Sequence, residues 1–102
     1  MNVVNADADD LTLARDIANR LLAGTGVKAI LFGSRARGDA RQWSDIDLAV
    51  DCGIDFPPSI LSALREAFEE SNILLNVDVV DLRDASPDVR SAVLQEGVPW
   101  IG

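Results

Sequence analysis

Histidine is absent from this sequence of 102 residues, and cysteine occurs once. Without histidine, Ser-His-Asp catalysis, Cys-His catalysis and histidine-ligated zinc are excluded. The single cysteine, Cys52, excludes an internal disulfide and a thiolate zinc site, and we interpret it as a small packed residue. Carboxylates, arginines and hydroxyls remain for chemistry, and carboxylate oxygens are ligands that Mg²⁺ prefers.

An excess of positive charge is also lacking. Nine Lys and Arg residues stand against 17 Asp and Glu residues, which gives a net charge of −8. Binding a long nucleic acid requires a cationic surface that displaces counterions from its phosphates, so we expect no general nucleic-acid binding. The few cations are nevertheless clustered, since Arg35, Arg37 and Arg41 lie close together in the sequence. Such a local basic patch suits one triphosphate better than a long polyanion.

Long apolar runs and a secretion signal are missing as well. No apolar stretch is long enough to span a membrane, and residues 1–7 lack the positive region of a secretory signal. We therefore expect a cytoplasmic protein without membrane contact. With 102 residues and 48% hydrophobic content, the chain is expected to form a single domain over residues 1–102, in which residues 1–9 are frayed.

The spacing of apolar residues predicts four helices and three strands. Three short apolar runs predict strands at residues 27–32, 46–50 and 74–80. Apolar stripes at helical spacing predict helices at residues 11–22, 34–39, 58–71 and 87–96. We expect Asp9 or Asp10 to cap the first helix and Ser86 to cap the last. The apolar residues 98–101 are expected to pack on the domain or on a partner. This order predicts an α/β fold in which helices cover a small sheet.

A glycine-serine turn follows the first predicted strand, in the run Gly-Ser-Arg-Ala-Arg-Gly that begins at Gly33. Gly33 permits a close backbone approach, and the exposed N–H groups that follow it favour an anion. Ser34 can offer both its N–H and its hydroxyl to a terminal phosphate. Taken alone, the turn is also typical of an ordinary helix cap.

Two aspartates, Asp45 and Asp47, begin the second predicted strand ten residues after this turn. Residues two apart in a strand point to the same side, so both carboxylates project together while Ile46 enters the core. Two unit charges about 4 Å apart repel by about 4 kcal/mol at an effective dielectric constant of 20. A divalent cation relieves this repulsion, whereas a solvated acidic turn is the alternative for the pair taken alone.

Together, the two motifs resemble the signature of the DNA polymerase β-like nucleotidyltransferases, which is Gly-Ser followed after ten residues by Asp-X-Asp. The fuller run is similar to the minimal nucleotidyltransferase (MNT) branch, the antitoxin half of HEPN/MNT toxin–antitoxin pairs. The resemblance implies a small mixed sheet with helices packed on it. It also implies a third carboxylate on a neighbouring strand. Asp78 is the match, because it interrupts an otherwise apolar strand, and we interpret Asp51 and Asp81 as surface acids.

The resemblance further implies a magnesium site and an ATP site. The implied catalytic residues and ligands of two Mg²⁺ ions are Asp45, Asp47 and Asp78. The implied contacts to ATP are Gly33, Ser34, Arg35 and Arg37. For each of the two arginines, an ion pair within the protein is an equally good interpretation.

Two further residues of the motif have no assigned role. Arg41 either contacts the triphosphate or offsets the charge of Asp39. Trp43 is a candidate for stacking on a base or for covering a partner interface, and partly buried packing is the simplest interpretation.

The function implied is Mg²⁺-dependent transfer of AMP from ATP to a hydroxyl of a partner protein. The resemblance implies a HEPN ribonuclease toxin as the partner, modified on a tyrosine in a hetero-oligomer, which makes this chain the antitoxin. Because the chain contains no tyrosine, modification of its own tyrosine is impossible. Two alternatives stay open: an antitoxin that neutralises by binding alone, and a nucleotidyltransferase that acts on a small molecule or RNA.

Overall fold

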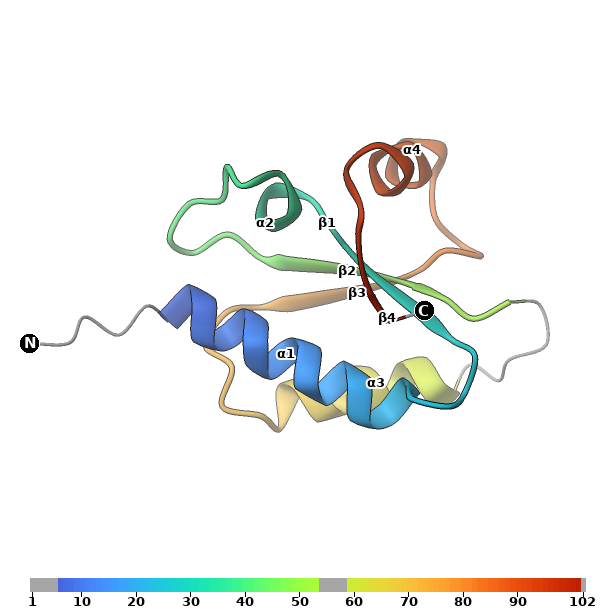
Figure 1. Ribbon diagram of the computed structural model, residues 1–102, viewed down its shortest axis with the longest axis horizontal. Coiled ribbons are helices and arrows are strands. Elements are labelled where there is room, and N and C mark those ends of the chain that lie inside the picture. The colour runs from blue at the N-terminus through green and yellow to red at the C-terminus, as the bar shows by residue number, and fades with distance from the viewer. Residues whose placement is uncertain (1–5, 54–58, 102) are drawn as a thin grey trace, which may run out of the picture.

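The computed structural model describes residues 6–53 and 59–101, which form a mixed sheet between two layers of helices (Figure 1). In chain order the elements are α1 (Ala6–Leu22), β1 (Lys28–Phe32), α2 (Ser34–Arg37), β2 (Ile46–Asp51), α3 (Ser59–Glu69), β3 (Val77–Asp81), α4 (Pro87–Glu96) and β4 (Val98–Ile101). The strand order is β3-β2-β1-β4, with β1 antiparallel to β2 and β4 and with β2 parallel to β3. The fold class expected from the sequence is confirmed. None of the helices described is long and apolar enough to cross a membrane.

The main core lies between the sheet and the helices α1 and α3, which cover the same face (Figure 1). Ala14 and Ala18 on the inner side of α1 are completely buried, and their small size lets the helix approach the sheet. Alternate residues of β2, namely Ile46, Leu48 and Val50, point into this core. Burying each such side chain contributes about 1.5–3 kcal/mol, so this face supplies most of the stability.

The opposite face of the sheet is covered by α2 and α4 (Figure 1). A smaller apolar cluster forms there around Phe32, Ala49 and Val93. Asp47 lies on this face because it is two residues from Ala49 along β2, and Asp78 of β3 is its register partner. The face is therefore apolar under α4 and acidic beside α2.

The start of the chain differs from the expectation. The helix α1 begins at Ala6, so residues 6–9 are helical where the sequence predicts fraying, and residues 1–5 lie outside the described residues. Asp10 does not cap this helix. Its carboxylate is buried and accepts hydrogen bonds from the N–H groups of Leu74 and Leu75, at 3.0 and 2.9 Å. The predicted loop and helix start at residues 54–58 also lie outside the described residues.

The apolar residues 98–101 form a fourth strand, β4, that the sequence does not predict. It pairs antiparallel with β1, with a register shift between Ala29 and Ile30. Pro99 lies within it, which is compatible with its position at the edge of the sheet. The expected cap of the last helix is confirmed, since the hydroxyl of Ser86 accepts from the N–H of Val89.

Candidate active site

The glycine-serine turn connects β1 to α2 directly against Asp47. Gly33 has φ 78° and ψ −159°, a backbone conformation that disfavours side chains. A Cβ atom on Gly33 would overlap the carboxylate of Asp47. Glycine is therefore required here both for its conformation and for the close approach. The two halves of the sequence motif meet at this contact.

Two carboxylates lie side by side near the start of β2, and a third precedes the strand. Asp47 and Asp78 are register partners on the parallel strands β2 and β3, and Asp45 immediately precedes β2. Neighbouring strands are about 4.8 Å apart, so the two partners lie side by side. Asp47 is half-buried, whereas Asp45 and Asp78 are exposed. The sequence suggests that an acid at position 78 would be costly to bury, but Asp78 is exposed because β3 is an edge strand. The pairing register of β2 and β3 is what brings Asp78 next to Asp47.

The surroundings of Asp47 disfavour the ionised form of its carboxyl group. Burial raises the pKa of Asp47 above its usual value, and the negative charges of Asp78 and Asp45 raise it further. Arg37 opposes this shift, while Glu96 adds to it. Of the ion pairs formed among the described residues, none involves Asp45, Asp47 or Asp78. The site thus concentrates negative charge that no ion pair among the described residues offsets.

These residues suit a magnesium ion that substrate helps to hold. Within residues 6–53 and 59–101, no three or more His, Cys, Asp or Glu side chains are grouped as a complete metal site. Mg²⁺ is usually bound by one or two carboxylates together with substrate phosphates and water rather than by a closed protein cage. Two adjacent carboxylates with a third nearby, close to a glycine-serine turn, fit that open arrangement.

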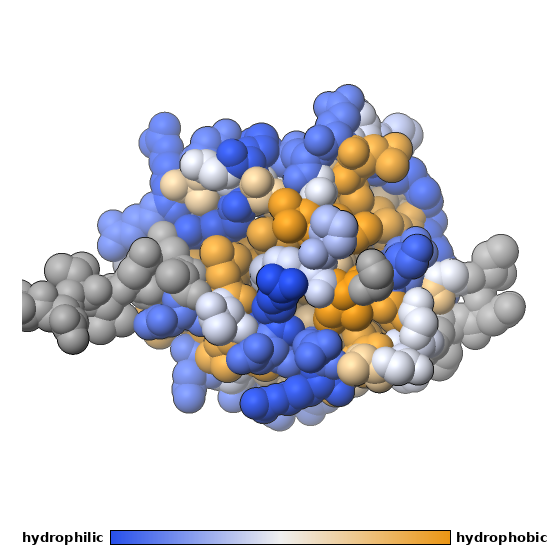
Figure 2. Space-filling view, in the orientation of Figure 1, coloured by the Kyte–Doolittle hydropathy of each residue, from blue (hydrophilic) through white to orange (hydrophobic). Residues whose placement is uncertain are grey.

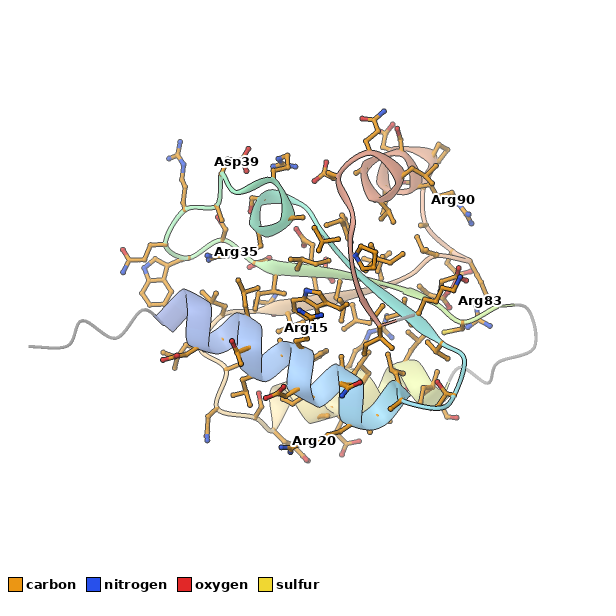
Figure 3. The ribbon with its side chains drawn as sticks, in the orientation of Figure 1. Arg15, Arg20, Arg35, Asp39, Arg83 and Arg90 are labelled. Atoms are coloured by element: carbon orange, nitrogen blue, oxygen red, sulfur yellow. The ribbon has the colours of Figure 1, made fainter. Side chains whose placement is uncertain are left out.

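The two arginines of the motif make different contacts. The guanidinium of Arg35 donates to the backbone carbonyls of Arg41, Gln42 and Ser44, at 2.9–3.3 Å, and so braces the loop that leads to β2 (Figure 3). Arg37 instead forms ion pairs with two carboxylates, Asp39 at 3.1 Å and Glu96 at 2.8 Å. A triphosphate contact stays a prediction for both.

Glu96, at the end of α4, belongs to the site although sequence reasoning placed it only along a helix. Its Oε2 atom accepts a hydrogen bond from the N–H of Gly33 at 2.8 Å and one from the guanidinium of Arg37 at 2.8 Å. One signal was available in the sequence. A glutamate just before Gly97, at the negative end of a helix dipole, is an unfavourable local choice that calls for a distant partner.

Three residues considered near the motif lie outside this arrangement. Trp43 is 67% exposed, so the interpretation of partly buried packing is wrong, because the loop that carries it leaves the ring in solvent. Asp81 is held by the guanidinium of Arg83 at 2.8 Å. Asp51 is exposed and accepts from the N–H of Gly53.

Comparison with known proteins bears directly on this arrangement. The sequence matches the family described as "Polymerase beta, Nucleotidyltransferase" over residues 24–100. It is 33% identical over 86 residues to MntA of Haemophilus influenzae, named a probable protein adenylyltransferase, and the match covers 84% of this chain and 74% of MntA.

Two solved structures share the fold. The crystal structure of a toxin–antitoxin with AMP-PNP matches with a TM-score of 0.67 and 28% identity, over 86% of this chain and 73% of that chain. A complex of the tri-AMPylated HEPN toxin of Shewanella oneidensis with its MNT antitoxin matches with a TM-score of 0.62 and 26% identity, over 89% of this chain and 71% of that chain.

Proposed function

Because this chain belongs to the polymerase β nucleotidyltransferase family and is a nucleotidyltransferase, we propose that its reaction moves AMP from ATP to a hydroxyl of a partner protein. The reaction depends on Mg²⁺, with two ions bound at the carboxylates. The partner is a HEPN-domain toxin that is modified on a tyrosine. The chain thereby acts as an antitoxin within a hetero-oligomer.

One observation carries this proposal. The backbone of Gly33 lies against the carboxylate of Asp47, and Asp78 is the register partner of Asp47 on the next strand. A turn suited to phosphate and a group of carboxylates suited to Mg²⁺ therefore share one place. Nucleotidyl transfer needs both at once, because the triphosphate and the metal must meet at the phosphorus that reacts.

The proposed step forms a bond between the acceptor hydroxyl oxygen and the α-phosphorus of ATP, and it breaks the bond to the bridging oxygen, which leaves with pyrophosphate. Asp45, Asp47 and Asp78 would hold the two Mg²⁺ ions. The chemistry that Mg²⁺ supplies when bound is neutralisation of the triphosphate and a lowered pKa of the attacking hydroxyl. Ser34 and the guanidinium of Arg37 orient the triphosphate, and Asp78 takes the hydroxyl proton. The position of Asp78 beside Asp47 and the lack of histidine in the chain support this role.

Several features support a protein as the acceptor. The related structures include a tri-AMPylated HEPN toxin in complex with an MNT antitoxin. The net charge of −8 disfavours RNA, and ATP as substrate is consistent with a cytoplasmic reaction. Apolar surface is exposed over α4 and β4 (Figure 2), where Leu94 is 87% and Val98 42% exposed. Such exposed apolar groups are typical of protein interfaces.

The test is intact-mass spectrometry of the protein encoded next to this chain, after incubation with this chain, Mg²⁺ and ATP. We expect the partner to gain the mass of AMP, and we expect the gain to disappear with Asp45→Asn. Asp51→Asn, an exposed aspartate at the far end of β2, is the matched control and should leave the modification intact. An unmodified partner in a tight complex would favour neutralisation by binding alone. Neither modification nor a complex would favour a small molecule or RNA as the acceptor.

A further inference from the structure

A single carboxylate oxygen ties the end of α4 to the glycine-serine turn. Oε2 of Glu96 accepts the N–H of Gly33 and the guanidinium of Arg37, each at 2.8 Å, across 63 and 59 residues of sequence. The side chain of Glu96 is only 19% exposed. Charge-assisted hydrogen bonds of this length are roughly twice as strong as neutral ones. The contact therefore fixes both ends of α2 relative to α4.

The helix that carries Glu96 is itself firmly seated. Gly97 follows directly, and a Cβ atom there would overlap the carbonyl of Val93 and the side chain of Ile30. The end of α4 thus lies flush against β1, and the N–H of Gly97 donates to the carbonyl of Val93 at 3.0 Å. Glu96 therefore reaches the turn from a helix end that packs closely on β1.

Local preference does not account for a glutamate at this position. The carboxylate faces the negative end of the α4 dipole, and it adds negative charge near Asp47, where charge is already concentrated. A glutamate that meets two unfavourable electrostatic effects needs a compensating contact. The bonds to Gly33 and Arg37 are that contact.

We propose that Glu96 is a positioning residue of the active site, which holds the Gly33 turn against Asp47 and aligns the guanidinium of Arg37. The role toward the triphosphate rests on the proposed function, whereas the hold on the turn does not. A competing arrangement uses the same contacts with the opposite effect: the carboxylate would occupy donors that a phosphate oxygen needs, and nucleotide would have to displace it. The end of α4 packs closely on β1, and the N–H of Gly33 is half-buried. Both observations favour the arrangement in which Glu96 positions the turn.

Two variants separate these arrangements. Glu96→Ala removes the acceptor, whereas Glu96→Gln keeps an oxygen for Gly33 but loses the charge opposite Arg37. Glu66→Gln is the matched control, since it removes the same charge from α3 on the other face of the sheet (Figure 1). Amide hydrogen exchange at Gly33, followed by NMR, reports the turn. Calorimetric binding of tripolyphosphate with Mg²⁺ reports the site without requiring transfer activity.

We expect Glu96→Ala to speed exchange at Gly33 and to weaken tripolyphosphate binding, each by about tenfold, which corresponds to 1.4 kcal/mol. Glu96→Gln should restore slow exchange at Gly33 while binding remains about threefold weaker, and Glu66→Gln should match the wild type. Unchanged exchange in Glu96→Ala, or tighter binding in either Glu96 variant, would overturn the proposal. If Glu96→Ala does not fold, the direction of the binding change in Glu96→Gln decides.

These outcomes remain separate from those of the proposed function. A wild-type protein that transfers no AMP, but whose Gly33 exchange depends on Glu96, would overturn only the proposed function. If the wild type binds no tripolyphosphate, the proposed function fails, and exchange at Gly33 alone decides the role of Glu96.

Discussion

Two aspartates on β3, Asp78 and Asp81, lie three residues apart and meet opposite conditions. The guanidinium of Arg83 and the backbone N–H of Arg83 hold the carboxylate of Asp81, and these hydrogen bonds lower its pKa. Asp78 lies beside Asp47, which has a raised pKa, and no ion pair of the described residues relieves either of them. The first arrangement stabilises the fold. The second destabilises it, which is typical of groups kept for a ligand.

The largest effect is expected from Asp47→Asn. Loss of one of the carboxylates proposed to bind the metal should lower AMP transfer by about a thousandfold, the upper end of the range for removing one group that stabilises the transition state. The same change should raise the melting temperature without metal at neutral pH, because it removes a strained charge. Activity assays and thermal unfolding of one preparation measure both effects.

The pH dependence of folding stability is the control for the predicted stabilisation by Asp47→Asn. The pKa of Asp47 is raised in the folded state. Below the unfolded pKa of about 3.9 Asp47 is protonated and does not destabilise the wild type, and the wild type loses folding stability as pH rises through the folded pKa. The advantage of Asp47→Asn should therefore grow from acid to neutral pH. A variant that is less stable than the wild type at neutral pH would contradict the account.

Gly33→Ala should be the next most harmful change. It places a Cβ at φ 78° and ψ −159°, a backbone region that essentially only glycine adopts, which costs about 1–3 kcal/mol, and it forces that atom onto the Asp47 carboxylate. Gly26→Ala is the matched control, because Gly26 has φ 82° and open space around it. We expect both variants to lose stability and only Gly33→Ala to lose AMP transfer, about a hundredfold. Equal activity in the two would show that the close approach to Asp47 has no role.

Asp10→Ala tests a carboxylate used purely for structure. It removes the acceptor of the N–H groups of Leu74 and Leu75, and a buried unpaired donor costs about 1–3 kcal/mol. We expect a loss of about 3 kcal/mol in the free energy of unfolding, measured by denaturant titration. Asp10→Asn retains an acceptor oxygen and should lose less than half of that. A loss equal in both variants would mean that the charge rather than the hydrogen bonds matters.

Asp81→Asn should have the smallest effect and the opposite pH dependence to Asp47→Asn. Losing the charged partner of Arg83 should destabilise the protein by about 1–2 kcal/mol at neutral pH. Because the pKa of Asp81 is lowered in the folded state, the advantage of the wild type is present above about pH 3.9 and is lost as pH falls through the folded pKa. Melting temperatures at pH 3 and pH 7 measure it, and AMP transfer should be unchanged.

Local patterns account for what could be predicted from the sequence. Alternation along β2 predicts the buried Ile46, and Ser86 before Pro87 predicts the start of α4. The spacing from Gly33 to Asp47 indicates a nucleotidyltransferase, and the comparisons confirm that family. The individual site residues stay predictions.

The features that sequence reasoning missed depend on contacts between distant segments. Glu96 meets Gly33 across 63 residues, and Asp10 meets Leu74 across 64, and no local pattern identifies the partner of either carboxylate. The strand β4 is missed for the same reason, since a short run containing Pro99 becomes a strand only because β1 offers an open edge.

The most direct test of the contrast is an NMR titration of the side-chain carboxyl groups of Asp47 and Asp81 in one sample, with and without Mg²⁺ and a non-hydrolysable ATP analogue. The account predicts that, without metal, the pKa of Asp47 lies above the usual aspartate value and that of Asp81 below it. Adding Mg²⁺ and the analogue should bring the pKa of Asp47 down sharply and leave Asp81 unchanged. An Asp47 pKa that does not respond to Mg²⁺ would contradict the claim that these carboxylates are kept for the metal.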